Sequence, residues 1–154
     1  PLPEKFDAIV AIESLIHSPD AMATVENLSR SLKTGGKFIL VDDMLTDEVP
    51  EKDIDFRLFR KHWRLWNVPA GEEYRRKFSE LDMDMKVDED LSHRFKTYPA
   101  EKLLRQRKWM SLLYRLLPMK PLRAVLSSYI AGGALQRLHQ RKLIAYRLLI
   151  GEKK

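Results

Sequence analysis

Two short apolar runs, separated by one amphipathic stretch, constrain the fold of this chain more than any other feature. Residues 6–12 read Phe-Asp-Ala-Ile-Val-Ala-Ile, and residues 37–41 read Lys-Phe-Ile-Leu-Val. Runs of this kind are typical of parallel strands that are buried on both faces. Between them, apolar residues recur at spacings of three and four from Met22 to Leu32, which is the helix period. The pattern predicts a strand–helix–strand unit with parallel strands, and therefore an α/β fold.

The ends of these predicted elements indicate where a ligand would bind. The helix is expected to start near Ser18-Pro19-Asp20, where the serine can cap it and the proline suits the first turn. Gly35-Gly36 is expected to stop it, and the second strand is expected to end at Asp42-Asp43. Ligands of open α/β sheets bind outside the carboxyl ends of the strands. This rule indicates residues 13–17 and 42–45.

The rest of the chain is predicted to be mostly helical. Residues 83–91 alternate weakly, as a half-buried strand does, and residues 142–152 are expected to form a closing strand. Residues 44–81 and 92–141 are expected to be helical insertions that form a lid. Within them, the aromatic and basic stretch 56–66 fits either a lid over an apolar substrate pocket or plain core.

Charge is distributed unevenly along the 154 residues. Residues 1–93 carry 13 basic and 20 acidic side chains, whereas residues 94–154 carry 15 basic and only two acidic ones. A basic region attracts anionic membranes or nucleic acid, although a solvated basic face explains the same composition. Residues 105–123 resemble a basic amphipathic helix that can lie on a membrane, and packing against the sheet is the alternative. The sequence has no recognition motif for nucleic acid, so no nucleic-acid partner is expected.

Other features narrow the class of protein. The chain has no cysteine, which excludes disulfides, thiolate metal sites and cysteine nucleophiles and fits a cytoplasmic location. No run of eighteen apolar residues is present, and no signal segment opens the chain. Asp42 and Asp43 are adjacent, so they should point to opposite sides of a strand, and no third ligand stands at motif spacing. No metal site is therefore predicted.

The segment around the first strand resembles a known family. Ala11-Ile12-Glu13, followed by His17 and Pro19-Asp20, is similar to the region after the fourth strand of class I (Rossmann-like) S-adenosylmethionine-dependent methyltransferases. The sterol and tocopherol methyltransferases resemble it most. Leu2-Pro3 and the Gly35-Gly36 strand entry fit the same pattern, with Thr34 in place of the family's proline. Residues 129–150 look like the closing helix and last strand of related small-molecule enzymes.

This resemblance implies that residues 1–154 are the C-terminal part of one methyltransferase domain, with the last strands of a partial Rossmann-like sheet and a helical lid. The family's glycine-rich cofactor loop and its ribose-binding acid have no counterpart in the chain. The N-terminal half of the same domain is therefore expected to be missing. The implied cofactor is S-adenosylmethionine, and the implied reaction is methyl transfer to a small, lipophilic acceptor through oxygen, carbon or nitrogen.

Two residues are the candidates for catalysis. His17 is expected to act as a base or substrate anchor, because histidine is the side chain that most often transfers protons near neutral pH; the alternative is a histidine that merely packs at the turn. Glu13 is expected to face the sulfonium or a substrate hydroxyl, and the alternative is a hydrogen bond to loop amides. Ala11, Ile12 and Glu13 are the predicted cofactor contacts, the first two through backbone and van der Waals contact.

The remaining histidines are predicted to lie outside the site. His62 and His93 are expected at the surface, and His139 is expected to belong to the basic face. A function from a different class also fits the composition. In that alternative the chain is a noncatalytic module that binds an anionic membrane surface or, less well supported, nucleic acid through residues 94–154.

Overall fold

The computed structural model describes residues 5–46 and 51–154, and its first half confirms the predicted strand–helix–strand unit. Strand β1 (Phe6–Ile12) leads through a short 3-10 helix η1 (Leu15–His17) into helix α1 (Ala21–Ser29) and strand β2 (Leu32–Leu45). β1 and β2 are parallel neighbours, with Val10 opposite Ile39. Leu2-Pro3, which carries part of the family resemblance, lies outside the described residues.

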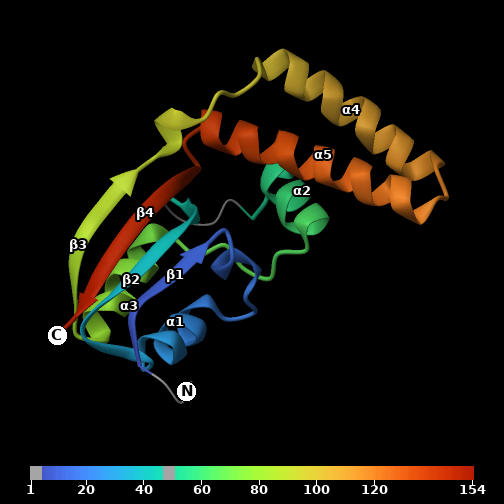
Figure 1. Ribbon diagram of the computed structural model, residues 1–154. Helices are drawn as coiled ribbons and strands as arrows, with labels where there is room; N and C mark the ends of the chain where they lie inside the picture. The colour runs from blue at the N-terminus through green and yellow to red at the C-terminus, as the bar shows by residue number, and fades with distance from the viewer. Residues whose placement is uncertain (1–4, 47–50) are drawn as a thin grey trace.

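The second half adds two strands to this unit. It also adds four helices, each of at least ten residues. In chain order the elements are α2 (Ile54–Trp63), α3 (Gly71–Glu80), β3 (Met83–Asp90), η2 (Ser92–Arg94), α4 (Ala100–Leu116), α5 (Lys120–Gln140) and β4 (Ile144–Lys153). The sheet order is β1-β2-β4-β3 (Figure 1). β4 runs antiparallel to both β2 and β3. The mixed α/β prediction is confirmed.

The first helix begins where the sequence predicts, but its capping residue and its end differ from the prediction. Ser18 does not cap α1; its hydroxyl pairs with that of Thr24 at 2.8 Å, and Asp20 caps the helix by accepting the N–H of Ala23 at 2.9 Å. α1 ends at Ser29, before the predicted glycine stop. Gly36 lies inside β2, where a Cβ atom would approach the Lys33 carbonyl oxygen to 2.8 Å. Gly36 therefore permits close backbone packing within a strand, Gly35 has a positive φ of 76°, and neither glycine ends a helix.

β1 departs from its predicted burial. Ala11 faces the core, but Val10 and Ile12 are 57% and 58% exposed. The reason is that α1 and α3 pack against the face that carries Ala11, whereas Val10 and Ile12 lie on the opposite face, which no helix among the described residues covers at β1. An apolar sequence that suits a strand buried on both faces therefore lies open on one face in this chain.

The core is divided into two clusters. One lies between the sheet and the helices α1 and α3, where the rings of Phe38 and Phe78 are 5.6 Å apart. The other lies at the far end of β2 and β4, where Phe56, Phe59 and Leu138 from α2 and α5 pack together. α3 is therefore part of the layer that covers the sheet, whereas α2 and the following residues Leu65 and Val68 belong to the second cluster.

Helices α4 and α5 form a hairpin that projects away from the sheet (Figure 1). Its base is tied to α2 through Asp55, which is 5% exposed. The Arg137 Nε atom donates to Asp55 at 2.9 Å, and Arg107 and Arg141 donate to the same carboxylate at 3.1 and 3.2 Å. Of the helices described, none combines the length and the apolar content needed to cross a membrane.

Candidate active site

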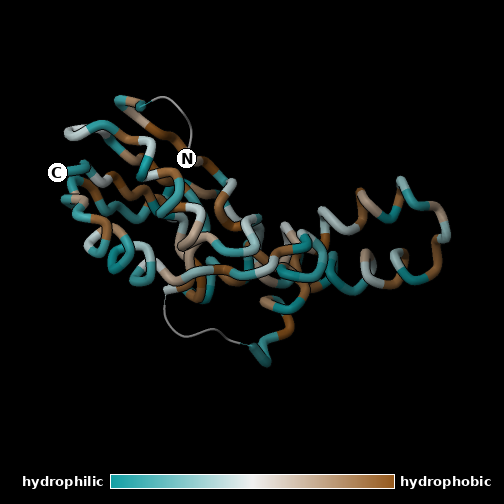
Figure 2. Tube along the Cα trace, turned by 90° about the horizontal axis from the view of Figure 1, so that it is seen from below, coloured by the Kyte–Doolittle hydropathy of each residue, from teal (hydrophilic) through white to brown (hydrophobic). Residues whose placement is uncertain are grey.

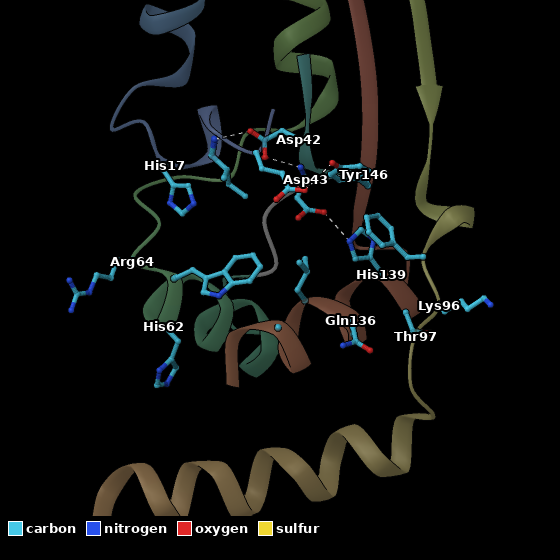
Figure 3. A pocket seen from close by; sticks show the side chains of 16 residues that line it. His17, Asp42, Asp43, His62, Arg64, Lys96, Thr97, Gln136, His139 and Tyr146 are labelled. Atoms are coloured by element: carbon cyan, nitrogen blue, oxygen red, sulfur yellow. Dashed lines mark hydrogen bonds and ion pairs between the residues drawn. The ribbon is translucent and has the colours of Figure 1, made fainter. Parts of the chain in front are cut away.

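A cavity of about 640 Å³ lies at the carboxyl ends of β1 and β2, where the strand rule predicts a ligand site (Figure 3). The strand ends form one side of it, and α2, α5 and residues 95–97 form the other. This volume is within the range of pockets that bind small molecules. The lining contains acids, histidines and aromatic or aliphatic side chains: Glu13, Ile16, His17, Asp42, Asp43, His62, Trp63, Arg64, Phe95, Leu135, His139 and Tyr146 among others.

Glu13 lies at the rim of this cavity, directly after β1. Its backbone has a positive φ of 47°, and its N–H donates to the Val41 carbonyl at 2.8 Å. The Tyr146 hydroxyl donates to Glu13 Oε1 at 3.0 Å. Burial, followed by the nearby Glu13 carboxylate, raises the pKa of Tyr146 to about 12. Glu13 is thus oriented by a side chain from β4 and not by the loop amides of the alternative interpretation.

His17 is the last residue of η1 and lines the same cavity. The preceding residues Leu15 and Ile16 are both 4% exposed, which anchors the turn, whereas His17 itself is exposed. Figure 3 shows its ring reaching into the space between the strand ends and the helices. The structure therefore brings the two predicted catalytic residues to one cavity. Of the predicted cofactor contacts, Ala11 is buried in the core and Ile12 is exposed beside Glu13.

Asp42 is the most deeply buried acid of the site, at 1% exposure. Its two oxygens accept the backbone N–H groups of Ile16 and Asp43, each at 3.0 Å, and no cation among the described residues pairs with it. Burial raises its pKa to about 6, against the opposing effect of the two amides. Asp42 therefore fixes the turn that carries His17, and its carboxyl group titrates close to neutral pH.

Asp43 and His139 form a second polar pair in the cavity. Asp43 Oδ1 lies 2.9 Å from His139 Nε2, and both side chains are about nine-tenths buried. The remaining ring nitrogen of His139 is buried and has no hydrogen-bond partner among the described residues. The ring of Phe95 packs 5.6 Å from His139 and 4.8 Å from Tyr146. The expectation that His139 belongs to the exposed basic face is wrong.

The sequence predicts a ligand site at residues 42–45 but no metal site at Asp42 and Asp43, because adjacent residues on a strand point apart. They do point apart, Asp42 to η1 and Asp43 to α5, yet the cavity wraps around the strand end and both line it. Their place at the end of β2, equivalent to that of Glu13 after β1, was the signal available. His62 is half-buried and lines the cavity, contrary to expectation, with Nδ1 2.7 Å from Ser127 Oγ, whereas His93 is exposed as expected. The groups of acids and histidines among the described residues include none that could hold a metal ion.

The fold of this chain is similar to about half of each of several solved methyltransferase structures. In agreement, residues 1–40 match the family model described as "Methyltransferase domain". An O-methyltransferase from Brevibacillus brevis, solved with S-adenosyl-L-homocysteine, superposes with a TM-score of 0.68 at 22% identity, over 99% of this chain and 45% of that one. Geranyl diphosphate C-methyltransferase from Streptomyces coelicolor superposes with a TM-score of 0.64 at 14% identity, over 100% and 50%.

A curated relative adds sequence similarity to this likeness of fold. The sarcosine/dimethylglycine N-methyltransferase of Halorhodospira halochloris is 34% identical over 88 residues, which are 57% of this chain and 31% of the relative. The chain thus spans less than a third of that relative and about half of the solved structures. The predicted resemblance is confirmed for the fold.

Proposed function

We propose that this chain provides the acceptor side of an S-adenosylmethionine-dependent methyltransferase. The observation that carries the proposal is the meeting of Glu13, His17, Asp42 and Asp43 in one cavity at the strand ends of this fold. When bound, S-adenosylmethionine supplies an electrophilic methyl group on a sulfonium. The exposed edge of β1 fits that cofactor, because Ile12 offers apolar surface and Glu13 offers negative charge at the same strand end.

The chain's own residues would position the acceptor and remove its proton. Holding two reacting groups in line supplies much of the catalysis in a displacement. His17, exposed in the cavity on an anchored turn, is placed to accept a proton from a hydroxyl or amine acceptor. Asp42 holds that turn through the Ile16 N–H, so it is a positioning residue.

The acceptor is proposed to have an apolar body. Trp63 and Leu135 line the side of the cavity formed by α2 and α5, and Phe95 and Tyr146 add a pair of rings that pack edge to face. Apolar walls with a few convergent polar groups are typical of small-molecule sites. The helices α2 and α5 would then act as the lid that the sequence predicts, with the acceptor atom turned towards the strand ends.

Two measurements on the protein expressed in full from its gene test these proposals separately. Tritium transfer from methyl-labelled S-adenosylmethionine should be faster to geranyl diphosphate or octylphenol than to dimethylglycine. A preference for dimethylglycine would refute only the proposal of an apolar acceptor.

The substitution His17→Gln should lower the rate of methyl transfer about 10²–10⁴-fold and leave cofactor affinity unchanged. The control substitution His93→Gln, at an exposed surface residue, should not lower that rate. Absence of any cofactor binding in calorimetry would refute the methyltransferase proposal.

A further inference from the structure

The tip of the α4–α5 hairpin carries an exposed apolar stripe that the active site does not use. On α4, Trp109 is 60% exposed and Leu116 68%; in the turn Met119 is 61% exposed, and on α5 Val125 and Tyr129 are 52% and 56% exposed. Packing against the sheet, one of the two explanations for this segment, is excluded for these residues. Apolar side chains exposed in this number on one projecting element indicate a contact surface.

These residues lie on one side of the hairpin. Gln106 of α4 and Tyr129 of α5 line a shared groove. From Gln106 the stripe continues at helical spacing through Trp109, Leu113 and Leu116, and from Tyr129 it runs back through Val125 and Leu122. The opposite side of the hairpin contacts α2, where the rings of Tyr114 and His62 are 5.0 Å apart. The stripe therefore faces away from the body of the protein.

The segment that carries the stripe is rich in cations and contains no acid. Residues 102–129 contain seven lysines and arginines and no aspartate or glutamate. Six of these cations are exposed and form no ion pair with any residue that the structure describes: Lys102, Arg105, Lys108, Arg115, Lys120 and Arg123. Arg123 stacks on Tyr114, with its guanidinium carbon 4.5 Å from the ring centre. Figure 2 shows the resulting mixture of apolar and polar segments along the projecting hairpin.

We propose that the tip of the α4–α5 hairpin binds the surface of an anionic lipid bilayer. An apolar stripe with tryptophan and leucine, flanked by unpaired lysine and arginine, matches both layers of such a surface: acyl chains below and anionic headgroups above. A nucleic acid would use the cations but would leave the aliphatic stripe without a partner. The hairpin would rest on the bilayer, since no described helix can span it. An apolar acceptor could then reach the cavity from the lipid.

Vesicle binding by the protein expressed in full tests this proposal. Binding to vesicles with 30% phosphatidylglycerol should exceed binding to pure phosphatidylcholine at least tenfold and should weaken with salt. Leu116→Glu with Met119→Glu should lower binding at least tenfold. The control Trp66→Glu, at a residue 66% exposed on the body of the protein, should leave binding unchanged. Brominated lipids should quench tryptophan fluorescence in the wild type, and Trp109→Phe should remove that quenching.

Several results would overturn the proposal. One such result is equal binding to anionic and neutral vesicles, and another is no binding to vesicles of either composition. The proposal would also fail if the protein binds RNA and the Leu116 and Met119 substitutions leave that binding intact, or if it forms a dimer that these substitutions dissociate. Methyl transfer to a water-soluble acceptor should be the same in the hairpin variants and the wild type, because the stripe lies outside the cavity. A defect in lipid binding is thereby separable from failure of the proposed methyl transfer.

Discussion

Two buried aspartates, one at the end of the sheet and one in the helical lid, are stabilised in opposite ways. Asp55 on α2 is contacted by the guanidinium groups of Arg107, Arg137 and Arg141. Asp42 on β2 accepts two backbone amides and pairs with no cation among the described residues. The charge of Asp55 is compensated by arginines and joins helices. The carboxyl group of Asp42 has no such partner in the described part of the chain; it lies in a cavity and its pKa is raised. Perturbed groups of the second kind concentrate at functional sites.

The largest expected effect comes from breaking the compensated pair. Asp55→Ala should lower the free energy of unfolding by about 3–5 kcal/mol, because it leaves a buried arginine without its partner. Urea denaturation followed by circular dichroism measures this. The control Glu72→Ala removes an exposed ion pair with Arg75 and should change stability by less than about 1 kcal/mol. Similar losses of stability in the two variants would mean that Asp55 does not hold α2 to the α4–α5 hairpin.

The uncompensated aspartate should make stability depend on pH in an unusual direction. The pKa of Asp42 is about 6 in the folded state against 3.8 unfolded, so the folded protein binds the proton more tightly. Stability should therefore fall as pH rises from about 4 to about 6, by about 3 kcal/mol in total. Denaturation of the wild type and of Asp42→Asn across this range isolates the contribution. Parallel pH profiles of the two proteins would contradict it.

A third aspartate, Asp53, should show the reverse dependence. It caps α2 through the N–H groups of Asp55 and Phe56, and its hydrogen bond to Arg141 lowers its pKa to about 2. Asp53→Ala should lose about 1–2 kcal/mol at neutral pH. The difference from wild type should shrink as pH falls from about 4 to about 2, since protonation removes the same interaction. A loss that stays constant over this range would refute the assignment.

The smallest expected effect concerns the orientation of Glu13. Tyr146→Phe removes the hydroxyl that donates to Glu13 but keeps the ring beside Phe95. Because Glu13 is exposed, the loss of stability should be no more than about 1 kcal/mol. The same variant should lower kcat/KM for methyl transfer by less than tenfold, through a less ordered carboxylate. A larger loss of stability would show that the pair supports the fold rather than the site.

The fold was predictable where a local pattern determines it. The parallel strands, the half-buried strand β3 and the closing helix and strand follow from apolar periodicity, and Glu13 and His17 follow from the strand-end rule and the family resemblance. The errors arose where partners come from distant parts of the chain. His139 looks like one more polar residue in a basic run until the fold places Asp43 beside it, 96 positions away. The three arginines of Asp55 are likewise brought together only by helix packing.

The open edge of β1 has a consequence for handling this chain. Among the described residues, the backbone of β1 beside exposed Val10 and Ile12 pairs with no strand on its outer side, so a further extended segment can add there by hydrogen bonding. Concentrated samples should therefore self-associate along that border, and a short synthetic β-strand peptide should suppress the association by occupying it. The same strand edge is a suitable boundary for split-protein complementation, in which two separately expressed pieces form one continuous sheet.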